Sequence, residues 1–180
     1  MSGQFSDGVH RFDDRADAAL EHVRGRSNVL DTLFTGASAL GDFSLIWHLV
    51  GGIRGLTSDH HANQAFLFSA LIGAESLIVN QGVKRLFRRT RPTVAGDPRF
   101  PVRTPSTSSF PSGHASAAFF AASLLTAWSG WPTLPAWFAL ACVVALSRAF
   151  VRIHHATDII GGAVLGLGLA QLTLLMLRSF

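Results

Sequence analysis

Residues 104–147 read TPSTSSFPSGHASAAFFAASLLTAWSGWPTLPAWFALACVVALS and contain no lysine, arginine, aspartate or glutamate. The hydrocarbon core of a bilayer is about 30 Å thick, so a helix that crosses it needs about 20 apolar residues. The stretch is too long for one such helix, and the SGWP sequence at 129–132 supplies a turn that divides it. It therefore predicts two membrane helices, at about 113–130 and 134–150.

The whole chain is poor in charge. Its 180 residues include 15 basic and 11 acidic side chains, or 14%, against about 25% in an average soluble domain. Ten of these charges fall within residues 1–31 and eight within 84–103. The remainder has too little polar surface to coat a water-soluble globule, which predicts an integral membrane protein and excludes a disordered chain. The single cysteine, Cys142, excludes an internal disulfide.

Three further apolar stretches, at about 33–56, 63–83 and 157–177, are long enough to cross a bilayer. With the two spans above, they predict an all-α fold: a polytopic, multi-pass membrane helix bundle of about five transmembrane helices. Residues 31–180 would form this transmembrane domain.

Residues 1–30 are expected to form a separate amphipathic segment at the membrane interface. Their five acidic residues exclude a signal peptide. Apolar residues recur at helical spacing, which favours a helix lying on the bilayer surface over a partly ordered polar tail: Phe5, Val9, Phe12, Ala16, Leu20 and Val23.

A long connection at 85–112 begins with a basic cluster, KRLFRRTRP at 84–92. Seven of the 15 basic residues lie between Lys84 and Arg103. One concentrated cluster beside apolar segments favours an anion site or a lipid headgroup contact, and no recognised module accompanies it that would indicate nucleic-acid binding. We expect Arg88 and Arg89 to contact headgroups or the interface and to matter less than Arg91 and Arg148.

A second motif, FPSGHAS at 110–116, opens the third predicted span. Ser112 can cap the helix, and Gly113 allows a ligand close to the backbone, where the free N–H groups of a helix N-terminus attract anions. Capping alone explains Ser112. It does not explain His114, because an ionisable group at the start of a long apolar helix is costly and suggests function.

A third motif, SRAFVRIHHATD at 147–158, ends the fourth span and begins the fifth. If it is helical or forms a tight helical turn, His154 and Asp158 lie on one face, where the carboxylate can fix the imidazole tautomer and leave one nitrogen as a nucleophile or base. Arg148 offers a planar fork suited to phosphate oxygens. A purely structural hydrogen bond between His154 and Asp158 is the alternative.

Counting five spans places all three motifs on one side of the membrane. The combination predicts a cationic cage with two histidines, one backed by a carboxylate, which suits phosphoryl transfer through a phosphohistidine. The sequence offers neither a carboxylate cluster for Mg²⁺ nor zinc spacing, so we expect no cofactor and no metal ligand.

The spacing of these motifs resembles the three-part signature of the type-2 phosphatidic acid phosphatase superfamily, which also includes vanadium haloperoxidases and bacterial non-specific acid phosphatases. Six residues separate Lys84 from Arg91-Pro92, and Pro111-Ser112-Gly113-His114 follows. Five residues separate Ser147-Arg148 from His154, and three more separate His154 from Asp158. The resemblance implies a metal-free lipid phosphate phosphatase in a bacterial cell membrane.

The resemblance also implies residue roles. His154 would be the nucleophile, Asp158 its orienting partner and His114 the acid for the leaving group. The remaining signature residues would bind phosphate: Lys84, Arg91, Ser112, Gly113 and Arg148.

The substrate is left open among a phosphatidic acid, phosphatidylglycerophosphate, a polyprenyl (di)phosphate and a polyprenyl-phospho-sugar phosphate, as is the oligomeric state. A vanadate-dependent haloperoxidase and a non-enzymatic transporter or scaffold are the competing classes. The apolar spans argue against the first, and the complete set of motif residues argues against the second.

Polar and small residues inside the spans carry further expectations. Glu75 could make a structural interhelix hydrogen bond or act in catalysis, and we expect the structural role. The same two roles are open for Asp42. Gly162 and Gly166 are expected to allow close helix packing within one chain.

Overall fold

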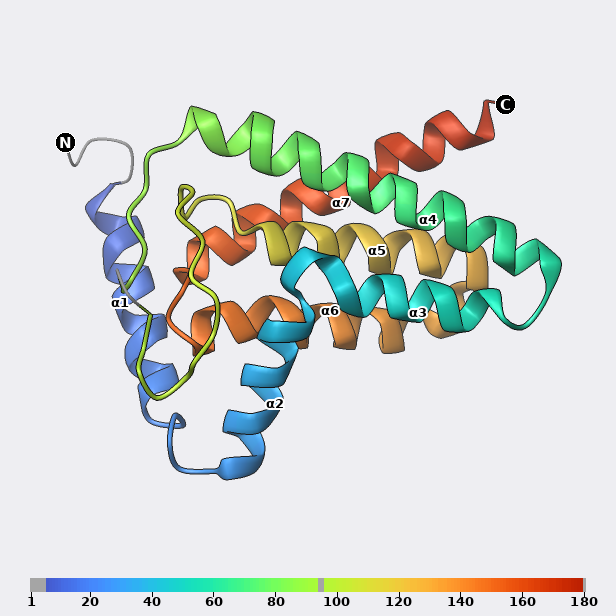
Figure 1. Ribbon diagram of the computed structural model, residues 1–180. Helices are drawn as coiled ribbons and strands as arrows, with labels where there is room; N and C mark the ends of the chain where they lie inside the picture. Colours follow the sequence, from blue (N-terminus) through green and yellow to red (C-terminus); the bar gives the residue numbers. More distant parts are fainter. Residues whose placement is uncertain (1–5, 94–95, 180) are drawn as a thin grey trace.

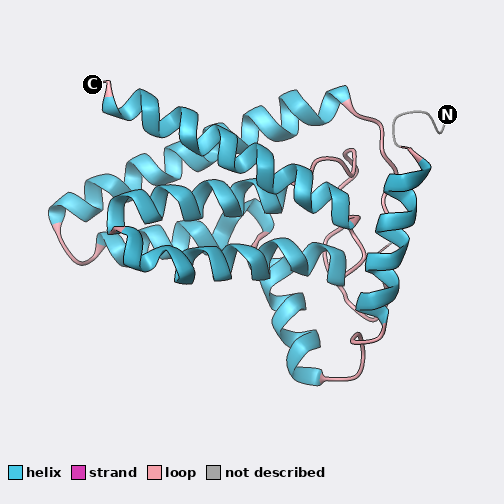
Figure 2. Cartoon of the chain, turned by 180° about the vertical axis from the view of Figure 1, so that it is seen from behind, coloured by secondary structure: helices cyan, strands magenta, loops and turns pink. Residues whose placement is uncertain are grey.

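The computed structural model describes residues 6–93 and 96–179, and within these ranges the chain folds into helices and loops with no strand. The predicted all-α class is therefore confirmed. Helices α3 to α7 run side by side, and α1 crosses one end of them (Figures 1 and 2). The main helices are α1 (Asp7–Glu21), α2 (Asn28–Leu40), α3 (Leu45–Gly55), α4 (Asp59–Leu77), α5 (Gly113–Ser129), α6 (Leu134–Phe150) and α7 (Ala156–Arg178).

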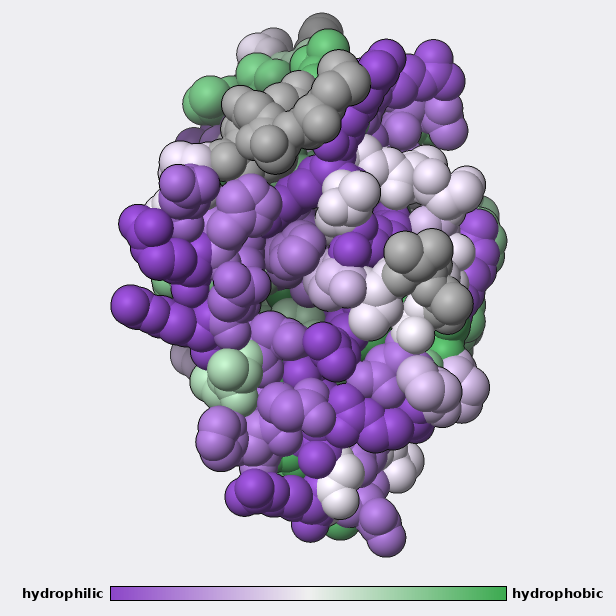
Figure 3. Space-filling model, turned by 90° about the vertical axis from the view of Figure 1, so that its left-hand side faces the viewer, coloured by the Kyte–Doolittle hydropathy of each residue, from purple (hydrophilic) through white to green (hydrophobic). Residues whose placement is uncertain are grey.

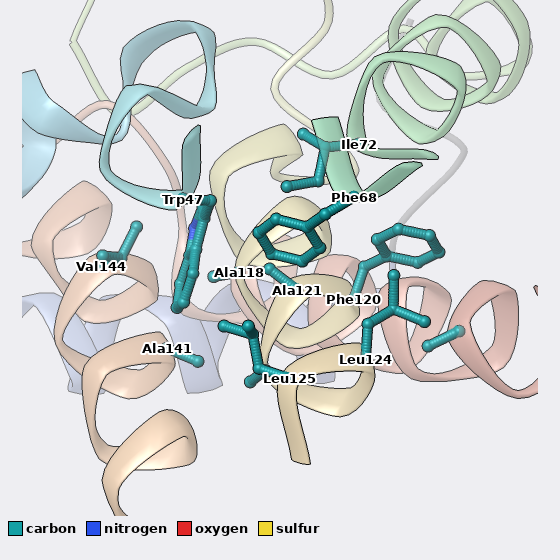
Figure 4. Packing of buried hydrophobic residues seen from close by; sticks show 12 residues of the cluster. Trp47, Phe68, Ile72, Ala118, Phe120, Ala121, Leu124, Leu125, Ala141 and Val144 are labelled. Carbon is teal, nitrogen blue, oxygen red and sulfur yellow. The ribbon is translucent and has the colours of Figure 1, made fainter. Parts of the chain in front are cut away.

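Helix α5, which opens the charge-free stretch, lies at the centre of the bundle, and most of its residues are buried. Around it packs an apolar core that includes Trp47, Phe68, Phe120 and Leu124 (Figure 4). Ser116 on α5 donates a hydrogen bond to Glu75 on α4. The predicted interhelix bond of Glu75 is therefore confirmed.

Helices α5 and α7 pack closely because α7 presents glycines to α5. A Cβ added at Gly162 would lie 2.4 Å from the carbonyl oxygen of Ser112, and one at Gly166 would lie 2.1 Å from that of Ser116. Both distances are far shorter than any van der Waals contact. The two glycines therefore serve packing within one chain, as predicted.

Fewer segments meet the length and composition of a membrane span than the five predicted. In the described part of the chain, three do: Asp59–Leu86, Trp131–Phe150 and Ala156–Arg178. A bent pair, Asn28–Leu40 with Asp42–Gly55, makes a fourth if it is one span. Helix α5 forms at the predicted place but has only 17 residues.

The prediction of one continuous helix over 33–56 is wrong. The chain bends by 73° between α2 and α3, where Phe43 and Ser44 adopt positive φ angles of 52° and 59°. Such angles interrupt helical hydrogen bonding. The break brings Gly41 against the ring of His114, where an added Cβ would lie 2.4 Å from His114 Cδ2. The bend therefore seats this segment against a residue of the second motif.

The N-terminal segment contains a helix, α1, although its buried face differs from the predicted apolar stripe. Phe12 is 48% exposed, whereas Asp13 is only 4% exposed. Leu20 does pack against buried apolar residues of α6. Phe5 lies outside the described residues. The interfacial position of α1 and the boundary at residue 30 stay predictions.

One end of the bundle differs in polarity from its sides. The end that carries α1 and the loop between α4 and α5 is largely hydrophilic (Figure 3). The sides of the bundle expose large apolar residues, such as Leu77 of α4 and Leu172 of α7. Exposed apolar side chains on long apolar helices indicate an integral membrane protein.

Candidate active site

A cavity of about 470 Å³ opens among the helix ends on the polar side of the bundle. Five of the predicted site residues line it: Lys84, Gly113, His114, Arg148 and His154. Lys84 lies in the short helical turn Val83–Leu86 that follows α4, and the others come from the start of α5, the end of α6 and the turn before α7. The three sequence motifs therefore meet in space, as predicted.

His154 lies in a tight turn between α6 and α7 rather than in a helix, because α7 begins only at Ala156. Of the two predicted alternatives for this stretch, a helix or a tight helical turn, the structure shows the turn. The turn is fixed by backbone bonds, since the N–H groups of Ile153 and His154 both donate to the carbonyl oxygen of Arg148 at 3.0 Å. These two hydrogen bonds hold His154 close to Arg148 at the end of α6.

Asp158 lies buried behind His154, with its Oδ2 3.5 Å from His154 Nδ1. The same oxygen accepts hydrogen bonds from Ser109 Oγ at 2.5 Å and from the backbone N–H of His155 at 2.8 Å. Its other oxygen, Oδ1, accepts from Arg89 Nη1 at 2.5 Å. Because every partner holds the carboxylate in place, Asp158 can orient the imidazole.

The environment of His154 keeps its imidazole neutral. Burial lowers the pKa of His154 to about 3, and hydrogen bonding to Asp158 opposes that shift only in part. Arg91 Nη1 lies 3.2 Å from His154 Nε2. With Nδ1 turned to Asp158, we assign the lone pair to Nε2, the nitrogen on the side of Arg91.

His114, in the first turn of α5, has its own carboxylate partner. Its Nε2 lies 3.2 Å from Asp42 Oδ1 and 3.1 Å from the carbonyl oxygen of Ser38. Both partners are acceptors, so Nε2 carries a proton. Asp42 comes from the break between α2 and α3, and its ambiguous place in an apolar segment is thereby explained.

Arg148 is fully buried and only partly satisfied. Its Nη1 donates to Ser38 Oγ, whereas its Nε and Nη2 have no hydrogen-bond partner among residues 6–93 and 96–179. A buried donor without a partner costs about 1–3 kcal/mol, and more when it is charged. Adjacent Nε and Nη2 donors form the planar fork that binds two phosphate oxygens.

Lys84 and the N-terminus of α5 add to this positive environment. The Lys84 Nζ lies 3.5 Å from the position that a Cβ on Gly113 would take, and Asn80 Oδ1 lies 3.0 Å from it. A side chain at residue 113 would therefore crowd the ammonium group and the free N–H groups of the helix. The absence of a side chain keeps this anion-attracting corner open.

Ser112 is the helix cap that its position suggested. Its hydroxyl accepts from the backbone N–H of Ala115 at 3.4 Å, and its own N–H donates to the carbonyl oxygen of Asp158 at 2.9 Å. The side chain is fully buried. A phosphate contact from Ser112 stays a prediction.

Metal-ligating side chains do not gather in the described part of the chain, where no group of three or more histidine, cysteine, aspartate or glutamate residues could hold a metal ion. The cavity instead presents cations. Lys84 and Arg148 line it together with Arg103, which stacks over the ring of Phe43 at 4.9 Å. Its charge suits an anionic ligand.

Arg89 does not make the headgroup or interfacial contact that we expected. It is buried and forms ion pairs with Asp13 and Asp158, each at 2.5 Å. The prediction is wrong because a carboxylate of α1 and one of α7 enclose the side chain. The parts that Ser38 and Ser109 play in the site could not be predicted from the sequence, since isolated serines form no recognisable pattern.

Comparison with known sequences identifies the family. The family model of the PAP2 superfamily matches residues 62–179 of this chain, and these residues include all three motifs. The chain belongs to the PAP2 superfamily. Its similarity to one relative extends further, since it is 36% identical over 154 residues to a decaprenylphosphoryl-5-phosphoribose phosphatase of Mycolicibacterium smegmatis, covering 81% of this chain and 80% of that protein. A protein of the same name from Mycobacterium tuberculosis is 41% identical over 86 residues, 47% of this chain and 45% of that protein.

Solved structures of PAP2 phosphatases share the fold. The transmembrane PAP2-type phosphatidylglycerolphosphate phosphatase of Bacillus subtilis has a TM-score of 0.74 at 24% identity, covering 97% of this chain and 89% of that chain. Aquifex aeolicus LpxE has a TM-score of 0.71 at 19% identity, covering 97% and 98%. This PAP2 protein is therefore a membrane phosphatase that hydrolyses phosphate monoesters.

Proposed function

We propose that this PAP2 phosphatase hydrolyses its substrate without a metal ion, through a phosphohistidine formed on His154. One observation carries the proposal. The buried fork of Arg148, with Nε and Nη2 unpartnered in the described residues, lines the same cavity as His154, whose Nδ1 faces Asp158. A phosphate placed on this fork would lie beside a neutral, oriented imidazole.

In the first step, His154 Nε2 attacks phosphorus, and the bond from phosphorus to the leaving oxygen breaks. Positive charge develops on the imidazole, and Asp158 stabilises it through Nδ1–H. Arg148, Lys84, Arg91 and the N-terminus of α5 stabilise the negative charge on the phosphoryl oxygens. Gly113 leaves room for that approach, and Ser112 holds the helix end.

His114 gives a proton to the departing oxygen, since a lipid or sugar alkoxide is strongly basic. Asp42, 3.2 Å from His114 Nε2, stabilises the imidazolium that such an acid requires. In the second step, His114 takes a proton from water, which attacks the phosphohistidine and releases inorganic phosphate. His154 then returns to its neutral form.

The charges of the cavity support metal independence. A metal ion in a phosphatase neutralises the phosphate oxygens and the leaving group. Here arginine and lysine side chains and a helix N-terminus offer that neutralisation, and Asp42 and Asp158 are each engaged with a histidine.

We propose a polyprenyl-phosphoryl sugar phosphate as the substrate and a bacterial cell membrane as the location. The support is the similarity to the decaprenylphosphoryl-5-phosphoribose phosphatase, together with the cavity lining. Neutral polar side chains suit a hydroxylated sugar, and Arg103 suits a second phosphate: Ser44, Ser76, Asn80, Gln81 and Thr107 line the same cavity as Arg103.

A phosphate-release panel in detergent with EDTA tests both parts. We expect turnover with EDTA present, and a higher kcat/KM for a polyprenyl-phosphoryl sugar phosphate than for phosphatidic acid or a polyprenyl diphosphate. Arg103→Gln should reduce the preference over phosphatidic acid, because phosphatidic acid carries no second, non-reacting phosphate. Activity that EDTA abolishes and Mg²⁺ restores would contradict the mechanism. A preference for phosphatidic acid would contradict the substrate.

A further inference from the structure

An aspartate of the N-terminal helix reaches the machinery behind His154. Asp13, on α1, is buried and accepts a hydrogen bond from Arg89 Nη2 at 2.5 Å. It also accepts from the backbone N–H of Thr157 at 2.9 Å and from its hydroxyl at 2.8 Å. Arg89 in turn donates to Asp158 Oδ1 at 2.5 Å. A continuous path of charged hydrogen bonds thus runs from α1 to the partner of His154.

The segment after α1 holds the other side of the same turn. Arg24 is buried, and its Nε and Nη2 donate to the carbonyl oxygens of Phe150 and Ala149, both at 2.8 Å. These carbonyls belong to the last turn of α6. A carboxylate at the N-terminus of α7 and a guanidinium at the C-terminus of α6 both match the helix dipoles. The N-terminal segment therefore clamps the two helix ends between which His154 lies.

Asp13 stands outside the phosphate cavity. It does not line the cavity of about 470 Å³, but it lines a smaller one of about 140 Å³ on the α1 side of the turn, which His154 also borders. Asp13 therefore has no route to the phosphate except through the residues that it holds.

The charge sequence along this path indicates what Asp13 does. Arg89 lies between two carboxylates, so Asp13 balances its charge and leaves Asp158 negative toward His154. Without Asp13, the full charge of Arg89 would act on Asp158 and weaken its stabilisation of the imidazole as positive charge develops there. Buried pairs are screened little by salt, so this effect is not lost in solution.

We propose that Asp13 is a positioning residue for catalysis, which acts through Arg89 to keep Asp158 oriented and charged toward His154. The inference rests on the proposed role of His154. It gives α1 a part in the reaction that is separate from any contact with the membrane surface.

The test compares Asp13→Asn with Asp14→Asn, which removes the same charge from the exposed neighbouring residue on α1. With an aryl phosphate in detergent, we expect Asp13→Asn to lower kcat about 10-fold, at the low end of the roughly 10–100-fold cost of removing a group that orients a reacting side chain. KM and the inhibition constant for inorganic phosphate should change less than about twofold. Loss of a residue that binds the phosphate directly would change both quantities by much more. Asp14→Asn should match the wild type.

A double-mutant cycle separates positioning from general loosening of the fold. In an Arg89→Gln background, Asp13→Asn should cost less than about twofold in kcat, because its effect passes through Arg89. If the two costs multiply, or if Asp13→Asn has the kcat of Asp14→Asn, the inference is overturned. If Asp13→Asn does not fold, Asp13→Glu replaces it and should retain a kcat well above that of Arg89→Gln; equality of the two overturns the inference. Turnover by His154→Ala in the same assay overturns the proposed function and this inference with it.

Discussion

The middle of the bundle and its polar end are built on different principles. The middle is an apolar core in which α5 is enclosed by its neighbours, with Trp47 and Phe68 among the residues packed there (Figure 4). The end is largely hydrophilic (Figure 3), and hydrogen bonds there join the N-terminal segment and the α4–α5 loop to the ends of α6 and α7. The comparison teaches that stability resides mainly in the first region and chemistry in the second. Variants in each region should therefore change different quantities.

The largest effect should come from the two histidines of the polar end. His154→Ala should abolish turnover of lipid and aryl phosphates alike, because no nucleophile remains. His114→Ala should lose roughly 10²–10⁴-fold on a lipid phosphate and much less on a nitrophenyl phosphate, whose leaving group needs no proton. Phosphate release measured on both substrates gives the comparison, with thermal unfolding as the folding control. Aryl phosphatase activity in His154→Ala but not in His114→Ala would reverse the two roles.

Replacing the buried fork should have the next largest effect. Arg148→Lys should lower kcat/KM about 10²–10³-fold, the usual cost of removing one group that stabilises developing charge. Lysine keeps the charge but cannot offer two parallel donors. Arg178→Lys, at the exposed end of α7, is the matched control. Equal kcat/KM values for the two variants would show that the fork does not bind phosphate.

A variant in the apolar middle of the bundle should lower stability rather than catalytic activity. Gly166→Ala places a methyl group against the carbonyl oxygen of Ser116, so it should lower the free energy of unfolding by roughly 1–3 kcal/mol, as overpacking does. Gly168→Ala is the control, since its added Cβ meets no atom within 4 Å. Unfolding in detergent measures the difference. A folded Gly166→Ala protein with normal stability and impaired turnover would break the division between the two regions.

The smallest effect concerns pH. Burial lowers the pKa of His154 to about 3, against about 6.5 in an unfolded chain. As pH falls, the unfolded state therefore takes up this proton before the folded state does. The contribution of His154 to the free energy of unfolding decreases as pH drops below about 6.5. The histidine NMR signal that His154→Ala removes should not titrate between about pH 5 and 8. Titration of that signal near its ordinary pKa would show a hydrated His154.

The same division separates what the sequence predicts from what it does not. Apolar length and the SGWP turn predict α5, α6 and α7 to within a residue or two, because burial in an apolar environment depends on composition. The break between α2 and α3 was missed, because positive φ angles at Phe43 and Ser44 arise from tertiary contacts rather than from a glycine or proline at those positions.

At the polar end, the sequence predicts those site residues that belong to the three spaced motifs. Lys84, Gly113, His114, Arg148 and His154 meet in one cavity as expected. The sequence does not predict the pairing of Asp13 with Arg89, since 76 residues separate them. Partners of buried charges depend on long-range folding, which local pattern does not encode.

Trapping the covalent intermediate tests the central claim most directly. The enzyme is mixed with an aryl phosphate whose phosphoryl group carries heavy-oxygen labels, quenched in base, which preserves a phosphohistidine, and digested for mass spectrometry. We predict label on the peptide that contains His154 in the wild type, and none on that peptide in His154→Ala. Label on a different residue, or label that persists in His154→Ala, would contradict the account.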